Sequence, residues 1–142
     1  MPGPEIPGTD HGCRLCGATK CDEDGRPVGD AFMLRPAEAY LSTNWLEGIG
    51  APARADQLAT VRRHLADKGM NLSANARVAV LHLHTVIEHV RSWSPDARVI
   101  TAHHEPEPLD PSHSGLYGYT ADDQLIADLI AQVVEEVHKA RE

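Results

Sequence analysis

Aromatic residues and cysteines are scarce in this sequence. Phe, Trp and Tyr account for 4% of the residues, so the hydrophobic core must consist mainly of Leu, Val, Ile and Ala. Three cysteines are too few for a framework of disulfides, and a chain of 142 residues does not need one. A single domain of this size buries about two-thirds of the surface that its unfolded chain exposes.

Long apolar runs and a targeting signal are also missing. No stretch approaches the roughly 18 consecutive apolar residues of a transmembrane helix, so we expect no membrane association. Residues 1–10 contain neither a basic start nor an apolar segment, which argues against a signal peptide. We therefore expect a cytoplasmic protein whose cysteines stay reduced.

Basic residues are outnumbered by acidic ones. The chain has 13 Lys and Arg against 21 Asp and Glu, a formal net charge of −8. Because an acidic chain repels phosphate backbones at long range, we do not expect binding to nucleic acids. The hydrophobic content of 42% still excludes a disordered tail.

The pattern of apolar residues predicts an α+β fold with a small mixed sheet of three to four strands. The expected helices lie near residues 37–46, 55–68 and 86–93, with a long C-terminal helix at 121–140. Residues 1–10 hold three prolines and two glycines, and we expect them to form a flexible leader. The remainder, 11–142, is expected to be one globular domain.

Two β-branched segments, 77–84 and 98–104, are the expected central strands. Apolar residues between them follow helical spacing, which predicts either a right-handed parallel crossover or an antiparallel pair with a helical excursion. The C-terminal helix is predicted from Thr120, a good N-cap, and from the most regular apolar stripe of the chain. That stripe comprises Leu125, Ile126, Leu129, Ile130, Val133, Val134 and Val137.

The segment that follows the leader has the spacing of a zinc site. Cys13 and Cys16 form a C-x-x-C motif followed by glycine, and two thiolates so spaced can grip one ion from a tight turn. Cys21 and His11 lie close by in the sequence. Because zinc prefers four tetrahedral ligands, we predict a structural Zn²⁺ bound by Cys13, Cys16, Cys21 and His11.

Other interpretations of this segment remain open. A distant histidine, His103 or His113, would serve as the fourth ligand and clip the N-terminal segment to the core. Unligated thiols, or a redox pair or disulfide, are the alternatives to a metal site.

Histidines are concentrated in the second half of the chain. On a strand, His82 and His84 would share one face and reach the same ion. A divalent metal held by His and Asp with an open position lowers the pKa of bound water toward neutrality, which predicts a metal-dependent hydrolase as the alternative function. Its candidate residues are His82, His84, His103, His104, Asp110 and His113. Scattered, partly buried histidines are the simpler explanation.

Two segments resemble sequences in other proteins. LSTNWLEG at 41–48 and HEPEPLDPSHSG at 104–115 are similar to L-S-x-N-W-L-E-like and D-P-S-H-S/A-like stretches of small bacterial proteins of unassigned function. The resemblance carries no activity and no catalytic residue. It does place five polar or aromatic side chains in the two segments: Asn44, Trp45, Asp110, Ser112 and His113.

Motifs of the common enzyme classes are missing. The chain has no Gly-rich phosphate loop, no G-x-S-x-G elbow and no H-E-x-x-H pattern. A Ser/His acyl-transfer site at Ser112 or Ser114 has little support, because neighbours in sequence rarely have the required geometry. The acidic composition and the proline-rich segment 105–111 suit recognition of a protein. We therefore expect a small zinc-binding accessory or interaction protein that acts through a protein partner.

Overall fold

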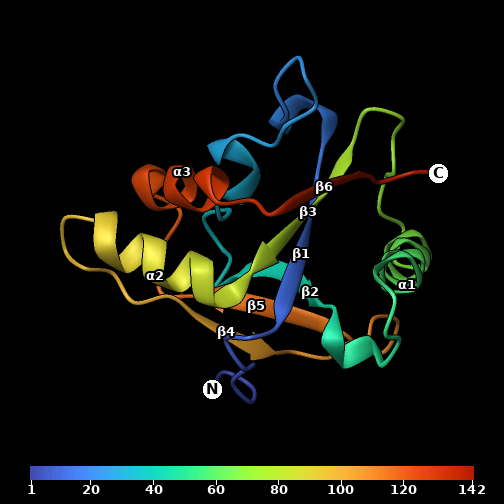
Figure 1. Cartoon of the computed structure of the whole chain (residues 1–142), viewed down its shortest axis with the longest axis horizontal. Coiled ribbons are helices and arrows are strands. Elements are labelled where there is room, and N and C mark those ends of the chain that lie inside the picture. The colour runs from blue at the N-terminus through green and yellow to red at the C-terminus, as the bar shows by residue number, and fades with distance from the viewer.

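The computed structural model, which describes residues 1–142, contains one six-stranded sheet and three α-helices (Figure 1). The strand order is β4-β5-β2-β1-β3-β6, and all paired strands are antiparallel. The strands are β1 (His11–Cys16), β2 (Leu41–Trp45), β3 (Arg77–His82), β4 (Thr101–His104), β5 (His113–Tyr117) and β6 (Glu136–Lys139). The α-helices are α1 (Arg54–Asp67), α2 (Leu83–Trp93) and α3 (Gln124–Gln132), and the short 3-10 helices are η1 (Ala18–Lys20), η2 (Gly29–Phe32) and η3 (Glu47–Ile49).

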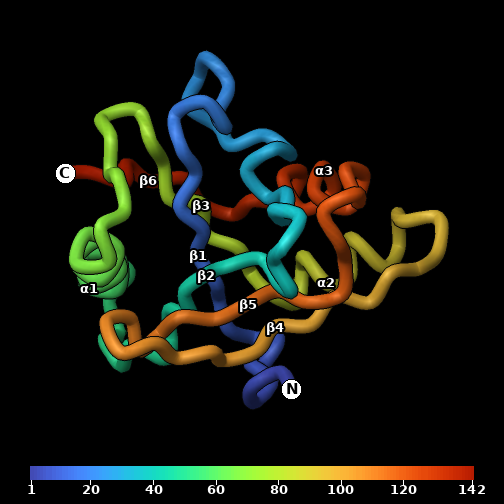
Figure 2. Tube along the Cα trace, turned by 180° about the vertical axis from the view of Figure 1, so that it is seen from behind, coloured from blue at the N-terminus to red at the C-terminus, as the bar shows by residue number.

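The sheet divides into two halves of three strands. Six register pairs join β1 to β3 and four join β2 to β5. Only two pairs, Gly12 with Trp45 and Cys13 with Asn44, join β1 to β2. Figure 2 shows β2, β5 and β4 running across the line of β1. The two halves therefore separate just beyond these shared pairs.

Helices cover both faces of the sheet. On β3, Ala79 and Leu81 pack into the larger core cluster, which also holds the buried side chains of α2 and α3. Val78 and Val80 point to the other face and pack against α1. This alternation is the period of two expected for a strand that is buried on both sides, and each fully buried aliphatic side chain contributes about 1.5–3 kcal/mol.

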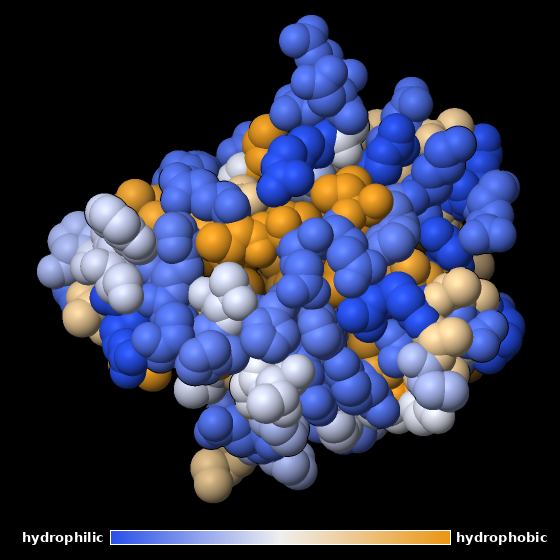
Figure 3. Space-filling model, viewed as in Figure 1, coloured by the Kyte–Doolittle hydropathy of each residue, from blue (hydrophilic) through white to orange (hydrophobic).

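Polar residues dominate the surface in Figure 3, and hydrophobic residues gather near the centre of that face, where β6 lies beside β3. No helix combines the length and apolar character that crossing a bilayer requires.

The predicted mixed sheet of three to four strands with a long C-terminal helix at 121–140 is wrong. The sheet has six antiparallel strands, and the longest helix is α1, with 14 residues. Residues 37–46, predicted as a helix, include strand β2. The segments predicted as a central strand pair became β3 and β4, which are separated in the sheet by β1, β2 and β5.

The C-terminal helix stops at Gln132 because the chain finds a strand partner. Val133 and Val134 are β-branched, and such residues favour strands over helices. The Glu135 N–H donates to the Val80 carbonyl at 2.8 Å, and Val137 pairs with Ala79. The free edge of β3 thus satisfies the backbone groups that a longer helix would have satisfied internally.

At the start of strand β2 the side chains alternate between buried and partly exposed, although the spacing of its apolar residues had suggested a helix. Leu41 and Thr43 are buried, and Ser42 between them is half-buried. The ladder partners of these residues come from β5, about 70 positions later in the chain. A segment whose partner is so remote cannot be recognised as a strand from local pattern alone.

The first residues of the expected leader lie along β4. The Ile6 N–H donates to the Ala102 carbonyl at 2.8 Å, and the His104 N–H donates to the Pro4 carbonyl at 2.9 Å. The Ile6 side chain is buried in the larger core cluster. These contacts cover an edge of the sheet that would otherwise offer unpaired backbone groups to solvent.

Candidate functional site

A cleft of about 920 Å³ opens where β1 and β2 separate. Asn44 lies at its base, opposite Cys13, where the two strands still pair. Beyond this point β1 continues to Cys16 in pairing with β3, and the earlier residues of β2 pair only with β5. The two walls of the cleft are therefore strand edges that face each other without hydrogen bonding to each other.

Backbone groups of both strands point into this cleft. The His11 carbonyl accepts a hydrogen bond from the Leu46 N–H, on the β2 side of β1. Since backbone groups alternate between the two sides of a strand, the N–H and C=O of Leu15 face the same side, where no strand follows. On the opposite wall, the Ser42 carbonyl accepts a hydrogen bond from a side chain instead of a strand.

That side chain is Arg14, which spans the cleft. Its Nε donates to the Ala31 carbonyl at 2.9 Å, and its Nη1 donates to the Ser42 carbonyl at 2.9 Å. Arg14 forms no ion pair with any carboxylate. A guanidinium has five N–H donors, so several remain unused, and burial lowers the pKa of Arg14. The cleft therefore contains a desolvated cation that no carboxylate contacts directly, although the charge of Glu38 acts on it from nearby.

A buried polar network supports the base of the cleft. The Asp110 carboxylate, which is fully buried, accepts hydrogen bonds from Asn44 Nδ2 at 2.7 Å and Lys68 Nζ at 2.6 Å. Asn44 Nδ2 also lies 3.0 Å from Ser112 Oγ, and Lys68 Nζ donates to Glu107 at 3.0 Å. The network thus links the LSTNW and DPSHS segments, which are far apart in the sequence, to the end of α1.

Lys68 stays cationic in this network. Burial alone would lower its pKa, but the hydrogen bonds to Asp110 and Glu107 outweigh burial and raise it. A lysine so held is not a nucleophile, because nucleophilic lysines need a lowered pKa. Lys68 therefore neutralises the two carboxylates and fixes their positions.

Two histidines border the network. His113 Nδ1 donates to the Glu105 carbonyl at 2.9 Å, since a carbonyl can only accept, and its Nε2 has no partner within the chain. His64 Nδ1 lies 3.6 Å from Asp110 and is the only buried side-chain nitrogen or oxygen without a hydrogen bond. His113 lines the cleft and can offer Nε2 to a ligand.

The thiols that line the cleft are unreactive. Burial raises the pKa of Cys13 and of Cys16 to about 12, so both remain protonated at neutral pH. Because the thiolate is the nucleophilic form, neither thiol is activated for covalent chemistry.

The four residues predicted to bind zinc do not converge. Cys13 packs against α1, whereas Cys16, three positions along the same strand, packs on the opposite face. His11 makes contacts of 2.7 Å with Glu47 and 3.1 Å with Glu135. No group of three or more His, Cys, Asp or Glu side chains has the geometry to hold a metal. Zinc binding stays a prediction, and metal analysis of the purified protein tests it.

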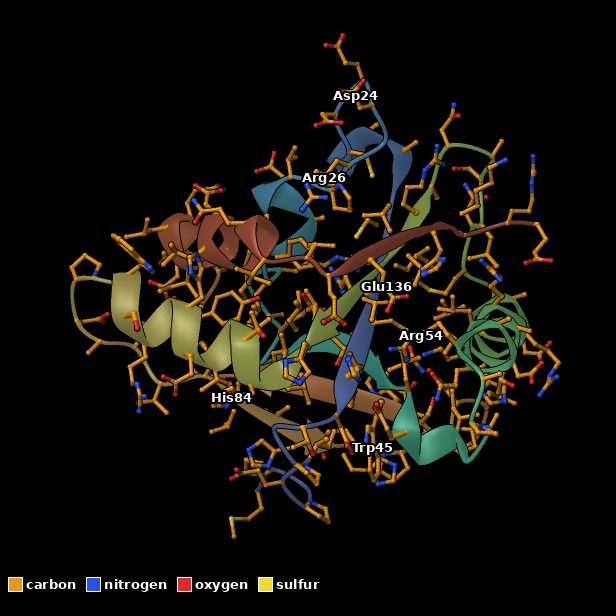
Figure 4. All side chains as sticks on the ribbon, viewed as in Figure 1. Asp24, Arg26, Trp45, Arg54, His84 and Glu136 are labelled. Atoms are coloured by element: carbon orange, nitrogen blue, oxygen red, sulfur yellow. The ribbon has the colours of Figure 1, made fainter.

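The candidate residues of the hydrolase hypothesis lie in separate places. His82 and His84, at the junction of β3 and α2, have ring centroids 6.5 Å apart, and Figure 4 shows His84 near the N-terminal segment. The residues of the 103–113 region lie on and beside β4 and β5. Within that region His104 Nε2 donates to the Pro111 carbonyl at 2.8 Å, and Asp110 is committed to Lys68.

A second charged cluster joins α1 to β6, away from the cleft. Arg54 Nε and Glu136 Oε2 are 3.2 Å apart, and Figure 4 shows the two side chains meeting between these elements. His138 Nε2 is 2.8 Å from the same glutamate. These contacts hold the last strand of the sheet in place.

Three residues of the site were not identified from the sequence: Arg14, His64 and Lys68. In the sequence, Arg14 lies between Cys13 and Cys16, and His64 lies on the predicted helix 55–68. Neither position distinguishes these two residues from ordinary surface polar residues. Lys68 follows Asp67 at the end of α1 and resembles a solvated helix terminus. Only the proline-rich segment, brought back against α1 by the fold, makes it a buried ion-pair partner.

Comparison with family models, with curated proteins and with solved structures returns no match for this chain. The interpretation of its function therefore depends on the geometry of the cleft.

Proposed function

We propose that this protein is a small interaction protein that binds an extended acidic segment of a cytoplasmic protein partner in the cleft between β1 and β2. The observation that carries the proposal is Arg14, a cation with two carbonyl acceptors and no carboxylate, which lines the cleft. Hydrogen bonds that involve a charged group contribute about 1.5–3 kcal/mol, so a ligand carboxylate that reaches the guanidinium gains substantial affinity.

An extended peptide fits the backbone of the cleft wall. The free N–H and C=O of Leu15 are the groups that an added strand requires, and strand addition to an exposed edge is a common mode of peptide recognition. Ser42 lines the opposite wall, and Asn44 closes the base of the cleft with its amide nitrogen already bonded to Asp110 and Ser112.

The charge of the cleft differs from that of the whole chain. Its lining includes four basic residues, Arg14, Lys20, Arg35 and Lys68, against three acidic ones, Asp30, Glu38 and Glu107. The chain as a whole carries a formal charge of −8. Lys68 is already bonded to Glu107 and to the buried Asp110, so the charges in and beneath the cleft nearly cancel. An acidic partner is therefore repelled less at the cleft than by the rest of the surface.

The state of the polar groups supports binding rather than catalysis. Lys68 and Asp110 form an ion pair with each other. The thiols of Cys13 and Cys16 have raised pKa values and stay protonated. No nucleophile in the cleft is paired with a base at hydrogen-bonding distance, which an activated nucleophile requires.

Fluorescence anisotropy with labelled octapeptides tests this proposal. An alternating Val-Glu peptide should bind, whereas a Val-Lys peptide should not, because only the former supplies carboxylates to Arg14. A Val-Glu peptide N-methylated at alternate amides should bind more weakly, since it cannot pair with a strand edge. Arg14→Gln should weaken binding of the Val-Glu peptide by about tenfold or more.

Two exposed charge reversals provide the matched comparison. Arg35→Glu changes a residue that lines the cleft, and Arg63→Glu makes the same change on the exposed surface of α1. We expect the first to weaken binding severalfold and the second to have little effect. Equal binding of the Val-Glu and Val-Lys peptides, no binding of either, or equal effects of the two reversals would contradict the proposal.

A further inference from the structure

Two tyrosines and a histidine form a platform beside the cleft. Tyr117 and His103 lie on the same face of the β4–β5 pair, and their rings meet edge-on with centroids 5.0 Å apart. The Tyr40 ring stacks on Tyr117 with centroids 4.9 Å apart and an interplanar angle of 32°. We call Tyr40, Tyr117 and His103 the aromatic platform.

A glycine allows the platform to lie flat on the sheet. Tyr40 covers Gly115 so closely that a Cβ atom at this position would come within 2.2 Å of Tyr40 Cδ1. Both tyrosines remain partly exposed. The platform therefore presents aromatic surface to solvent over a half of the sheet that α1 does not cover.

Carboxylates surround this aromatic surface. The Tyr117 hydroxyl donates a hydrogen bond to the Glu105 carboxylate. Burial raises the pKa of Tyr40, and the charges of Glu105 and Glu107 raise it further, so both carboxylates lie near its hydroxyl. The nearby cation, Lys68, is already bonded to Glu107 and Asp110. The platform thus combines aromatic rings with an excess of negative charge.

The faces of aromatic rings attract cations through the ring quadrupole, and adjacent carboxylates strengthen that attraction. We infer that the aromatic platform binds a cationic group, the ammonium or guanidinium of a Lys or Arg side chain on the partner segment. Phosphate-bearing ligands are repelled by the same carboxylates. A neutral ligand, such as a sugar ring, would gain nothing from the charge.

The platform adjoins the cleft through His113. The Tyr40 and His113 rings have centroids 5.9 Å apart, and His113 and Glu107 both line the cleft. A segment with a carboxylate at Arg14 would continue past His113 and place a basic side chain over Tyr40. The inference that the cation belongs to the partner segment rests on the proposed function. The inference that the platform binds a cation does not.

Choline and 3,3-dimethylbutan-1-ol, its uncharged isostere, test the platform without a peptide. In NMR titrations of the full chain, choline should shift the ring resonances of Tyr40 and Tyr117 in a saturable manner, and the isostere should not. Tyr40→Phe should bind choline within about twofold of the wild type, and Tyr40→Leu should weaken binding by about fivefold or more. Trp93→Leu, which removes an exposed aromatic residue on α2, is the matched control and should leave binding unchanged.

A second measurement distinguishes failure of the proposed peptide binding from failure of the proposed cation site. Adding a Lys to the Val-Glu octapeptide, at the end that reaches the platform, should tighten binding severalfold in the wild type but not in Tyr40→Leu. Choline binding without peptide binding would overturn the proposed function and leave the cation site standing. Equal binding of choline and the isostere, or no loss of choline binding in Tyr40→Leu, would overturn the cation site.

Discussion

Replacing Asp110 by Asn tests whether the buried network is a principal source of stability. The Asp110 carboxylate is fully buried and accepts hydrogen bonds from Lys68 Nζ at 2.6 Å and Asn44 Nδ2 at 2.7 Å. Asn has almost the same shape but no charge, so Asp110→Asn leaves Lys68 with one carboxylate partner, Glu107. The substitution therefore removes the negative charge, and because the amide NH₂ replaces one of the two acceptor oxygens, it also removes one of the two hydrogen bonds.

The expected loss follows from the cost of breaking a buried ion pair. Removing one partner of such a pair costs about 3–5 kcal/mol, because the other charge is left uncompensated. Lys68 is about 20% exposed and keeps Glu107 at 3.0 Å, which places the loss at the lower end, about 3 kcal/mol. For a chain of this length the corresponding decrease in Tm is on the order of 10 °C.

Urea unfolding at pH 7, followed by far-UV circular dichroism, measures this loss. Lys68 carries its charge at pH 7, because its raised pKa means that it loses its proton only at strongly alkaline pH. Lys68→Met should also destabilise the protein by about 3 kcal/mol, since it leaves the Asp110 carboxylate buried without its cation. The double variant should lose less than the sum of the two single losses, with a coupling energy of about 1–3 kcal/mol.

Asp67→Asn, on the exposed side of α1 next to Lys68, is the matched control and should change stability by less than about 0.5 kcal/mol. The reasoning is refuted if Asp110→Asn costs under about 1 kcal/mol, or if the two single losses simply add in the double variant.

Two further predictions concern thiol reactivity and acid stability. Burial raises the pKa of Cys13 and Cys16 to about 12, whereas Cys21 is only partly buried, although its pKa is also raised. A thiol reagent at pH 8 should therefore label Cys21 first and the other two only after unfolding, and labelling of all three at the same rate would contradict the structure. A hydrogen bond from Arg98 lowers the pKa of Asp123, so its contribution to stability is present above the ordinary value of 3.8 and is lost as the pH falls through the lowered value. Asp123→Asn should therefore lower the Tm by about 1–3 °C at pH 6, and the difference should vanish by about pH 2; a difference that persists there would refute the ion pair as its cause.

The helices that depend on local pattern were the parts of the fold that the sequence indicated well. The stripe of Leu58, Val61 and Leu65 predicts a helix at 55–68, and α1 occupies 54–67. These three residues face the smaller core cluster. Helical pattern is local, because residues three and four positions apart meet on the same face whatever the rest of the chain does.

The strands were harder to predict from the sequence, because each strand depends on a partner that is remote in the chain. Val133, Val134 and Val137 continue the apolar stripe of α3 and fit a helix as well as a strand. This segment forms strand β6 because the free edge of β3 offers hydrogen-bond partners to its backbone. Likewise, β2 exists because β5 lies beside it.

The zinc prediction also depends on tertiary structure, and metal analysis of the purified protein is still needed to test it. The spacing of Cys13 and Cys16 suits two ligands on a tight turn, but on a strand an offset of three residues places their side chains on opposite faces. Whether C-x-x-C forms a turn or part of a strand depends on β3, which pairs with β1 through Cys16.

The sequence by itself determined composition, charge, a single-domain length, the position of α1, and the two polar segments around Asn44 and Asp110. Only the tertiary structure joined those segments through Lys68 and left Arg14 without a carboxylate in a cleft between two strands. The physical reason is that buried ion pairs and sheet ladders are formed between groups distant in the chain. The energies of these interactions depend on which residues the fold brings into contact, and the local sequence does not specify those contacts.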